Sequence, residues 1–578
     1  MPAPSPVQLA TSIANYAITA NGAPLDTSIQ VQAIDVWLGV NKLPKARLVV
    51  SDGSAADRDF PVSAGDALVP GATLEIKLGY GSSQTTVFSG VVHRHGLQTT
   101  ANGPSRLVVE ATDKAMVMTL ARKNAIFQNT TDSNLCQSLI SNAGLSADVS
   151  STSVTHASIV QYYASDWDLM VIRAQLNGMV VIVDSGKVSI APPTTSTSPV
   201  LTLTYGESIL DFRADMDATT QLTPASIQSF AWDSSTQALA TSGSAQANVA
   251  TPGNISSATL AGVFNVASYW QQSAGELQAA ELTAWSSAEL LKSQLAKIRG
   301  EARFQGSALA RPGAMVTLAG LGDRFNGDAY TSGVHHRLSE GLWRTTVEIG
   351  LSPSWFAATA PGVSAPGASG QLPPANNLMA GTVKQIDQDP DGEFRVLVTV
   401  PLLQAAQSAG VWARFGAFYA STNIGACFYP EIGDEVVLGF LSGDPRYPVV
   451  LGSLYSKKNP PPNTPVAANT LKMFMSKSKL HIDFDEDKKS ISLITPAKQS
   501  VVICDNENSI VLTDSNGNTV KMNSSGITLN SASDITLSAS GSITLSAQSA
   551  LKASGAASVN VGSDGMVQVK GATVALNP

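Results

Sequence analysis

The sequence predicts a mainly β, multidomain chain that ends in an intertwined trimeric β-helix needle. Three observations predict this fold. Short runs rich in β-branched and apolar residues recur between glycine- and proline-containing turns over most of the chain. A turn-and-hairpin motif from the first part of the chain returns in the second part. From Gly526 onward an apolar pair recurs every eight residues, which is typical of a stacked repeat.

The eight-residue repeat places two apolar side chains on one face of each short strand, because strand side chains alternate. The pairs expected to form the trimer needle core are Ile527 and Leu529, Ile535 and Leu537, Ile543 and Leu545, Leu551 and Ala553, Val559 and Val561, and Val567 and Val569. One copy buries little apolar surface, whereas three copies wound round one axis would bury every pair and leave no strand edge open. The alternative is a disordered tail rich in Ser and Ala, but disorder requires no fixed register.

The composition excludes several classes of protein. The net charge of -8 argues against nucleic acid as a partner, since phosphate binding needs a basic surface. Cys136, Cys427 and Cys504 are scattered, which predicts neither a disulfide framework nor a zinc site and fits a reducing cytoplasm. The N-terminus lacks the features of a signal peptide, and no apolar run approaches the ~20 residues that span a bilayer. We therefore expect synthesis in the cytoplasm without a signal peptide.

Residues 1–112 contain short strands at the spacing of a small β-barrel. Residues 113–195 predict an α/β insertion with two helices. Asp132 is the expected N-cap of the first helix, and Ser165 or Asp166 is the expected N-cap of the second.

Residues 196–355 predict a second β-barrel with one long helix, which we expect over residues 274–300. An internal repeat supports two similar barrels. The sequence Pro-Gly-Ala is followed at nearly the same distance by Ser-Gly-Val and histidine, at 70–72 with 89–93 and at 312–314 with 332–336. Three chains would then place six similar barrels around one axis.

The rest of the chain divides at proline-rich segments. Residues 356–378 read as a linker, and residues 379–456 contain five or six short strands that fit an OB-fold barrel. Residues 457–470 form a Pro-rich neck. Strands resume in residues 471–578, the predicted β-helical needle.

Residues 430–462, PEIGDEVVLGFLSGDPRYPVVLGSLYSKKNPPP, resemble the OB-fold signature of phage T4-type cell-puncturing proteins and of VgrG proteins. The matching signature residues are Pro430, Gly433, Asp434, Glu435, Gly443, Asp444, Pro445 and Gly452. Residues 302–320 and 330–338 look like the second hub barrel of VgrG, and residues 165–178 look like its inserted helix.

The resemblance implies a trimeric central spike and baseplate hub protein of a contractile injection system. Such proteins terminate the inner tube, contact baseplate proteins and cross the target membrane transiently when they puncture the envelope. The family often carries a PAAR-type tip protein, for which the expected tip docking residues are Val574, Leu576, Asn577 and Pro578. The sequence departs from some relatives because it shows neither a lysozyme insert nor a C-terminal effector domain, although effector cargo could dock non-covalently. The last histidine is His481, so we do not expect a metal apex.

Catalytic and metal chemistry is not expected. The histidines in 93–95 and 335–336 sit at corresponding places in the repeat, so a structural role at a barrel or subunit interface is favoured over a metal site. Asp434 and Glu435 are adjacent on a strand and point to opposite faces, so they do not form an acid/base pair. The acidic run at 483–487 lacks the spacing of a calcium loop. We expect no enzyme activity and no cofactor.

Two other functions were compared with the spike. A tail fibre or a receptor- or glycan-binding protein with a β-helical stalk would carry a carboxylate-lined cleft or an aromatic binding face. Residues 485–578 contain no aromatic residue, which counts against this alternative. A carrier with a fused effector is the other alternative. The sequence leaves open a phage tail, a type VI apparatus or an extracellular injection particle.

Overall fold

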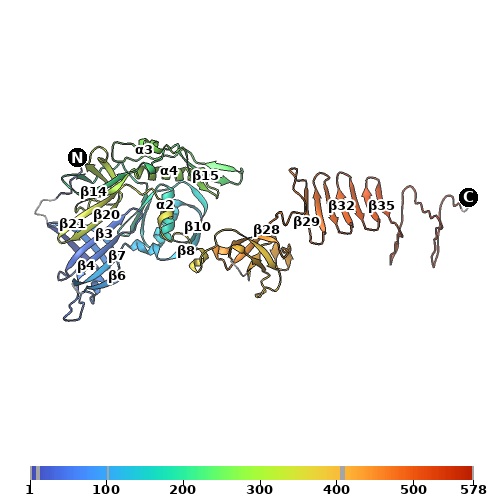
Figure 1. Ribbon diagram of the computed structural model, residues 1–578, viewed down its shortest axis with the longest axis horizontal. Coiled ribbons are helices and arrows are strands. Elements are labelled where there is room, and N and C mark those ends of the chain that lie inside the picture. The colour runs from blue at the N-terminus through green and yellow to red at the C-terminus, as the bar shows by residue number, and fades with distance from the viewer. Residues whose placement is uncertain (1–2, 8–12, 101–102, 404–409, 576–578) are drawn as a thin grey trace. The chain divides into compact units, whose positions relative to one another are not determined.

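The computed structural model describes residues 3–7, 13–100, 103–403 and 410–575, which form two units, 1–371 and 372–578 (Figure 1). The described residues are mainly β, as the sequence predicts. None of their helices combines the length and the apolar character that crossing a bilayer requires. The short 3-10 helices are η1 (Asp66–Leu68), η2 (Lys114–Thr119), η3 (Ala218–Thr220), η4 (Gly367–Gly370), η5 (Pro401–Leu403) and η6 (Leu441–Gly443).

The first unit is built on one 13-stranded sheet. Its main path runs β14-β18-β21-β20-β3-β4-β7-β6-β5-β1-β2, and β13 joins it through β19, which pairs with β20. The strands are β1 (Ala14–Ala20), β2 (Ala23–Pro24), β3 (Val31–Gly39), β4 (Lys45–Ser51), β5 (Thr73–Tyr80), β6 (Ser83–Thr100), β7 (Gly103–Thr112), β13 (Leu201–Thr204), β14 (Ile209–Met216), β18 (Ile298–Gln305), β19 (Met315–Ala319), β20 (Gly327–Ser339) and β21 (Leu342–Ile349).

The strands of the two predicted hub barrels are therefore joined in one sheet. The antiparallel pair β3–β20 connects them, with Asp35 opposite Arg337. Two separate apolar cores remain, one centred on residues such as Ile34 and Leu48 and the other on residues such as Phe304. The joining pair was not foreseen, because strand partners far apart in sequence leave no local signal.

The internal repeat recurs in the backbone. The Gly71 N–H donates to Val92 O at 2.8 Å, and the Gly313 N–H donates to Thr331 O at 2.8 Å. Both glycines have positive φ, which an L side chain rarely adopts. The partner of Gly71 lies 21 residues on and that of Gly313 only 18, so the turns correspond but the histidine-containing segments do not align as the sequence suggested.

The segment after β7 forms an α/β layer with two helices, α1 (Asp132–Asn142) and α2 (Asp166–Leu176). Its strands are β8 (Arg122–Thr131), β9 (Ser146–Val149), β10 (Thr155–Ser165), β11 (Val180–Asp184) and β12 (Lys187–Ala191). Ser165 caps α2 as predicted, through the Asp168 N–H. The prediction for α1 is wrong by one residue, because the Thr131 hydroxyl accepts from the Asn134 N–H and Asp132 is instead buried against Arg173.

The remaining part of the first unit carries a three-stranded sheet and three helices. These elements are β15 (Ile227–Asp233), β16 (Ala238–Thr241), β17 (Tyr269–Ser273), α3 (Ser257–Phe264), α4 (Ala279–Leu295) and the short α5 (Phe356–Thr359). The long helix was expected to reach Gly300, but α4 ends at Leu295 and β18 begins at Ile298. Burial of Ile298 and Phe304 in the sheet core overrides the helical pattern there.

The second unit begins with a closed five-stranded barrel of order β22-β23-β24-β28-β27. Valines such as Val396 and Val436 fill its core. The strands are β22 (Met379–Gln385), β23 (Val396–Thr399), β24 (Val411–Phe415), β27 (Glu435–Phe440) and β28 (Pro448–Ser453), with a hairpin of β25 (Ala420–Ser421) and β26 (Ile424–Gly425). This closed barrel is the topology that the sequence predicted.

A seven-stranded antiparallel meander follows (Figure 1). Each strand has five residues and pairs with the next along the chain. The strands are β29 (Leu471–Met475), β30 (His481–Asp485), β31 (Ser490–Ile494), β32 (Ser500–Cys504), β33 (Ser509–Thr513), β34 (Thr519–Asn523) and β35 (Gly526–Asn530). From 531 to 575 the chain contains no helix or strand.

Candidate functional site

One face of the meander carries two continuous rows of apolar side chains. Cross-strand pairing aligns the first row through Phe474, Ile482, Leu493, Val501, Leu512, Val520 and Leu529. The second row lies two residues away on each strand and runs through Phe484, Ile491, Ile503, Ile510, Met522 and Ile527. We call these two rows the apolar ladder.

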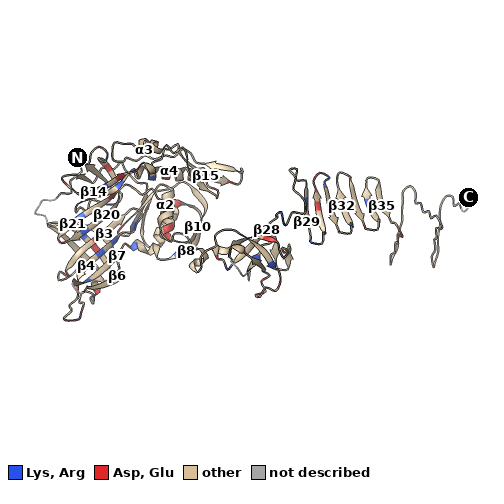
Figure 2. Cartoon of the chain, in the orientation of Figure 1, with Lys and Arg blue, Asp and Glu red and all other residues tan. Residues whose placement is uncertain are grey.

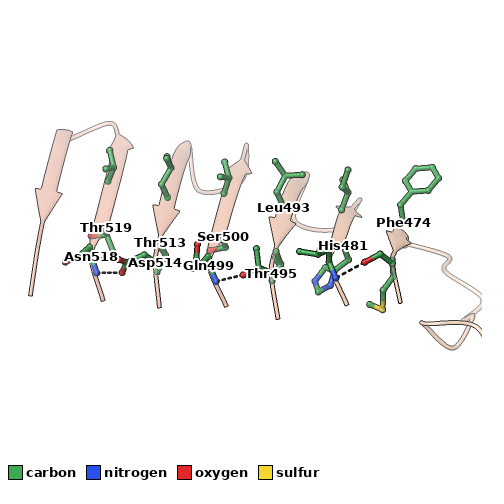
Figure 3. A pocket seen from close by; sticks show the side chains of 18 of the residues that line it. Phe474, His481, Leu493, Thr495, Gln499, Ser500, Thr513, Asp514, Asn518 and Thr519 are labelled. Carbon is green, nitrogen blue, oxygen red and sulfur yellow. Dashed lines mark hydrogen bonds between the residues drawn. The ribbon is translucent and has the colours of Figure 1, made fainter. Parts of the chain in front are cut away.

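The apolar ladder is largely open to solvent in the single chain. Leu493 is 46% exposed, and Leu529 at the last strand is 53% exposed. A groove of about 1220 Å³ runs beside the first row, as Figure 3 shows for Leu493 and its neighbours. The charged residues of the meander lie mainly in 472–489, and none of them belongs to the apolar ladder (Figure 2). A continuous apolar surface of this extent marks an interface.

The residues between the ladder positions face the other side of the sheet. This opposite row runs from Asp483 through Ser492, Val502, Val511 and Lys521 to Thr528. Lys521 and Thr528 are exposed. The sheet is thus apolar on one face and mixed on the other, which is the pattern of a sheet that packs on one side only.

The meander repeats with a period of 19 residues that the sequence reasoning missed. Turns at one end of the strands begin at Ser476, Thr495 and Asp514, and each first residue donates its N–H to the carbonyl four residues on, at 2.8, 3.0 and 3.1 Å. The side-chain oxygens of the three residues accept from the N–H of Leu480, Gln499 and Asn518 (Figure 3). An alignment of residues 490–508 with 509–527 would have found this period.

The predicted octad core begins where the ladder ends. Ile527 and Leu529 are the last members of the two rows. The other octad residues lie beyond β35, and Ile535, Leu537, Ile543, Leu545, Leu551, Val559, Val561, Val567 and Val569 are all exposed in the single chain. Their role as a trimer core stays a prediction. Of the predicted tip residues, Val574 is 52% exposed, whereas Leu576, Asn577 and Pro578 lie outside the described residues.

The OB-fold signature residues hold two tight turns of the barrel. Asp434 closes the first turn, because its carboxylate accepts from the Glu431 N–H at 2.9 Å. Asp444 closes the second by a paired contact with the Arg446 guanidinium, which lowers the pKa of that carboxyl below its ordinary value. The other signature residues lie in or beside these turns and strands: Pro430, Gly433, Glu435, Gly443, Pro445 and Gly452. These positions shape the barrel and bring no reactive groups together.

His95, His335 and His336 have structural partners, whereas His93 is exposed. His95 contacts Ser63 Oγ at 2.7 Å and Leu68 O at 2.9 Å, while a bulge at His93 interrupts the alternation expected there. His335 stacks on Trp37 and contacts Asp35 at 2.9 Å. His336 is buried, and desolvation lowers its pKa to about 3.

No group of three metal-ligating side chains occurs within the described ranges. In the acidic run, the Asp485 carboxylate accepts from the Lys488 N–H at 3.0 Å, and Glu486 pairs with Lys472 at 3.0 Å. The first contact closes the turn between β30 and β31, and the second joins that turn to β29.

Comparison with known proteins defines the class first. Residues 379–455, the closed barrel, match the family described as the type VI secretion system/phage-baseplate injector OB domain. This match confirms the resemblance drawn from residues 430–462. Residues 10–340, more than half of the sequence, match the family described as the Alg8 N-terminal domain. The chain belongs to this family.

Curated relatives match a short part of the chain. The spike protein VgrG1a of the Pseudomonas aeruginosa type VI secretion system is 34% identical over 59 residues, which are 10% of this chain and 9% of that protein. The actin cross-linking toxin VgrG1 of Vibrio cholerae is 36% identical over 58 residues, 10% of this chain and 5% of that protein. The matched part thus spans less than a tenth of either relative.

Solved structures align with longer stretches of this chain. A tail protein from Neisseria meningitidis covers 59% of this chain and 98% of its own at 12% identity, with a TM-score of 0.44. The E. coli c3393 protein, a type VI secretion component, covers 76% of this chain and 99% of its own at 13% identity, with a TM-score of 0.38.

Proposed function

We propose that this chain is a structural spike and baseplate hub protein of a contractile injection system, which acts as a trimer, terminates the inner tube and punctures the target envelope. One observation carries the proposal: an injector OB domain is followed directly along the chain by a sheet with an unpaired apolar ladder. The role is mechanical, so it needs no catalytic group.

A trimer would bury the apolar ladder. A lone sheet that leaves one apolar face in water lacks the burial that normally stabilises a sheet. Three copies arranged around one axis with their ladders inward would bury both rows. The rod would then resist bending, because many backbone hydrogen bonds and buried contacts would have to break together. The octads from Ile527 to Val569 would extend the same core toward the tip.

The other parts of the chain supply attachment in this proposal. Residues 1–112 and 196–355 form the hub that contacts the inner tube and baseplate proteins, with 113–195 as the α/β insertion. Residues 356–378 and 457–470 act as linker and neck around the OB domain at 379–456. The end of the needle, 471–578, receives a PAAR-type tip protein, and effector cargo docks non-covalently.

The test uses the full-length chain in the cell that encodes it. Native mass spectrometry of the purified chain should give the mass of three copies. An affinity-tagged chain should copurify with sheath and inner-tube proteins, and gold label on the tag should mark one end of the inner tube in electron micrographs. A monomeric chain would overturn the proposal. Label on lateral fibres would favour the alternative of a tail fibre or a receptor- or glycan-binding protein.

A further inference from the structure

A polar cavity of about 460 Å³ lies in the first unit, apart from the apolar ladder. It is formed where α4 ends, where α3 begins, and by the loop that precedes α3. The side chains that matter for its chemistry are Asn248, Asn254, Ser257, Gln294 and Lys297. All five carry hydrogen-bond donors, and only one of them carries a charge.

Lys297 is the unusual member of this set, because its side chain is only 2% exposed. Its ammonium donates to the Ile255 carbonyl at 3.0 Å. An ammonium has three N–H donors, and the described residues supply no carboxylate in an ion pair with this one. Burial lowers the pKa of Lys297, with no neighbouring charge to offset it. Buried charges are normally paired, so this one lacks its counter-charge.

The start of α3 adds further donors to the same cavity. Ser256 is the N-cap and accepts from the Thr259 N–H at 3.0 Å. The Leu260 N–H donates to the Ser256 carbonyl at 3.1 Å, so the Ser257 and Ala258 N–H groups are the ones left without an acceptor in the helix, where the dipole places partial positive charge. Ser257 and Ala258, the first two residues of the helix, line the cavity. The Arg324 guanidinium donates to the side-chain oxygen Oδ1 of Asn254 at 2.8 Å.

We propose that this cavity binds a small oxyanion, with the Lys297 ammonium as its counter-charge and the first turn of α3 as its second donor group. Two independent features converge on the same ligand: a buried cation without an anion, and a helix N-terminus that opens into the same polar space. Sulfate, phosphate and a carboxylate share the oxygen acceptors that these donors require.

The experiment uses the full-length chain and hydrogen–deuterium exchange of peptides from 253–264. Sodium sulfate should slow exchange in this segment, whereas sodium chloride at equal ionic strength should not. Lys297→Met removes the charge and should weaken the apparent sulfate affinity by about tenfold or more, because the charged donor is lost. A parallel titration with sodium acetate separates a carboxylate from a tetrahedral oxyanion.

A second variant tests the proposal independently, in case Lys297→Met does not fold. Ala258 is exposed in the first turn of α3, so neither Asp nor Asn there would bury a polar group. Ala258→Asp places a negative charge beside the site and should abolish the effect of sulfate, whereas Ala258→Asn, of nearly the same shape, should retain it. The proposal is overturned if chloride protects equally, if neither sulfate nor acetate protects, or if Ala258→Asp responds to sulfate as the wild type does.

Discussion

The substitution Leu529→Asp tests the apolar ladder at its last strand. Leu529 pairs with Val520 in the first row, and it is also a member of the predicted octad core. The neighbouring residue Thr528 faces the opposite side of β35, beside Lys521. Thr528→Asp therefore introduces the same charge one residue away on the other face, and it serves as the matched control.

The expected magnitude follows from burial. Leu529 is 53% exposed in the single chain, so assembly has about half of its side chain left to bury. Full burial of a leucine contributes about 1.5–3 kcal/mol, so burying the half that is still exposed would contribute roughly 1 kcal/mol per chain and about 3 kcal/mol per trimer. A carboxylate at this position would be buried three times near one axis, at a cost of several kcal/mol each. Together these losses are on the order of 10 kcal/mol per trimer.

Sedimentation equilibrium and native mass spectrometry measure this loss directly. Wild type and Thr528→Asp should remain trimeric at micromolar concentration, whereas Leu529→Asp should sediment as a single chain. Because the last strand is already exposed in the single chain, the far-UV circular dichroism spectrum of the full-length chain should change little. A trimer of undiminished stability for Leu529→Asp would refute the inward orientation of the ladder, and so would equal disruption by Thr528→Asp.

Two further predictions concern stability within each unit. The pKa of His336 is lowered to about 3 from an ordinary value of 6.5, so between these two pH values the unfolded chain binds more protons than the folded chain. The stability of the first unit should therefore fall as the pH falls through this range. The loss at pH 5 is about 2 kcal/mol, and His336→Gln should remove this pH dependence in urea titrations. Gly425 has φ 146°, and an added Cβ would lie 2.6 Å from the Tyr419 backbone carbonyl oxygen, so Gly425→Ala should cost about 2 kcal/mol or more. Gly433→Ala should cost only about 1 kcal/mol, because Gly433 has φ 95° and an added Cβ would have no atom within 4 Å. A reversed order of the two variants in thermal unfolding would contradict this account.

Features written in local sequence were predictable. The Asp434 and Asp444 turns, the Ser165 cap and the closed barrel at residues 379–456 all depend on residues close together in the chain. The 19-residue period of the meander was also present in the sequence. It escaped notice because its turn residues differ, with Lys498 in one repeat at the position of Gly517 in the next.

The sequence by itself determined the mainly β character, the OB barrel and the apolar pairs at Ile527 and Leu529, because strand periodicity and turn chemistry are local. Only the tertiary structure decided that β3 pairs with β20 and that α4 ends at Leu295, because these depend on partners far away in the chain. It also revealed the buried charge of Lys297, since burial is a property of the packed elements rather than of any short segment.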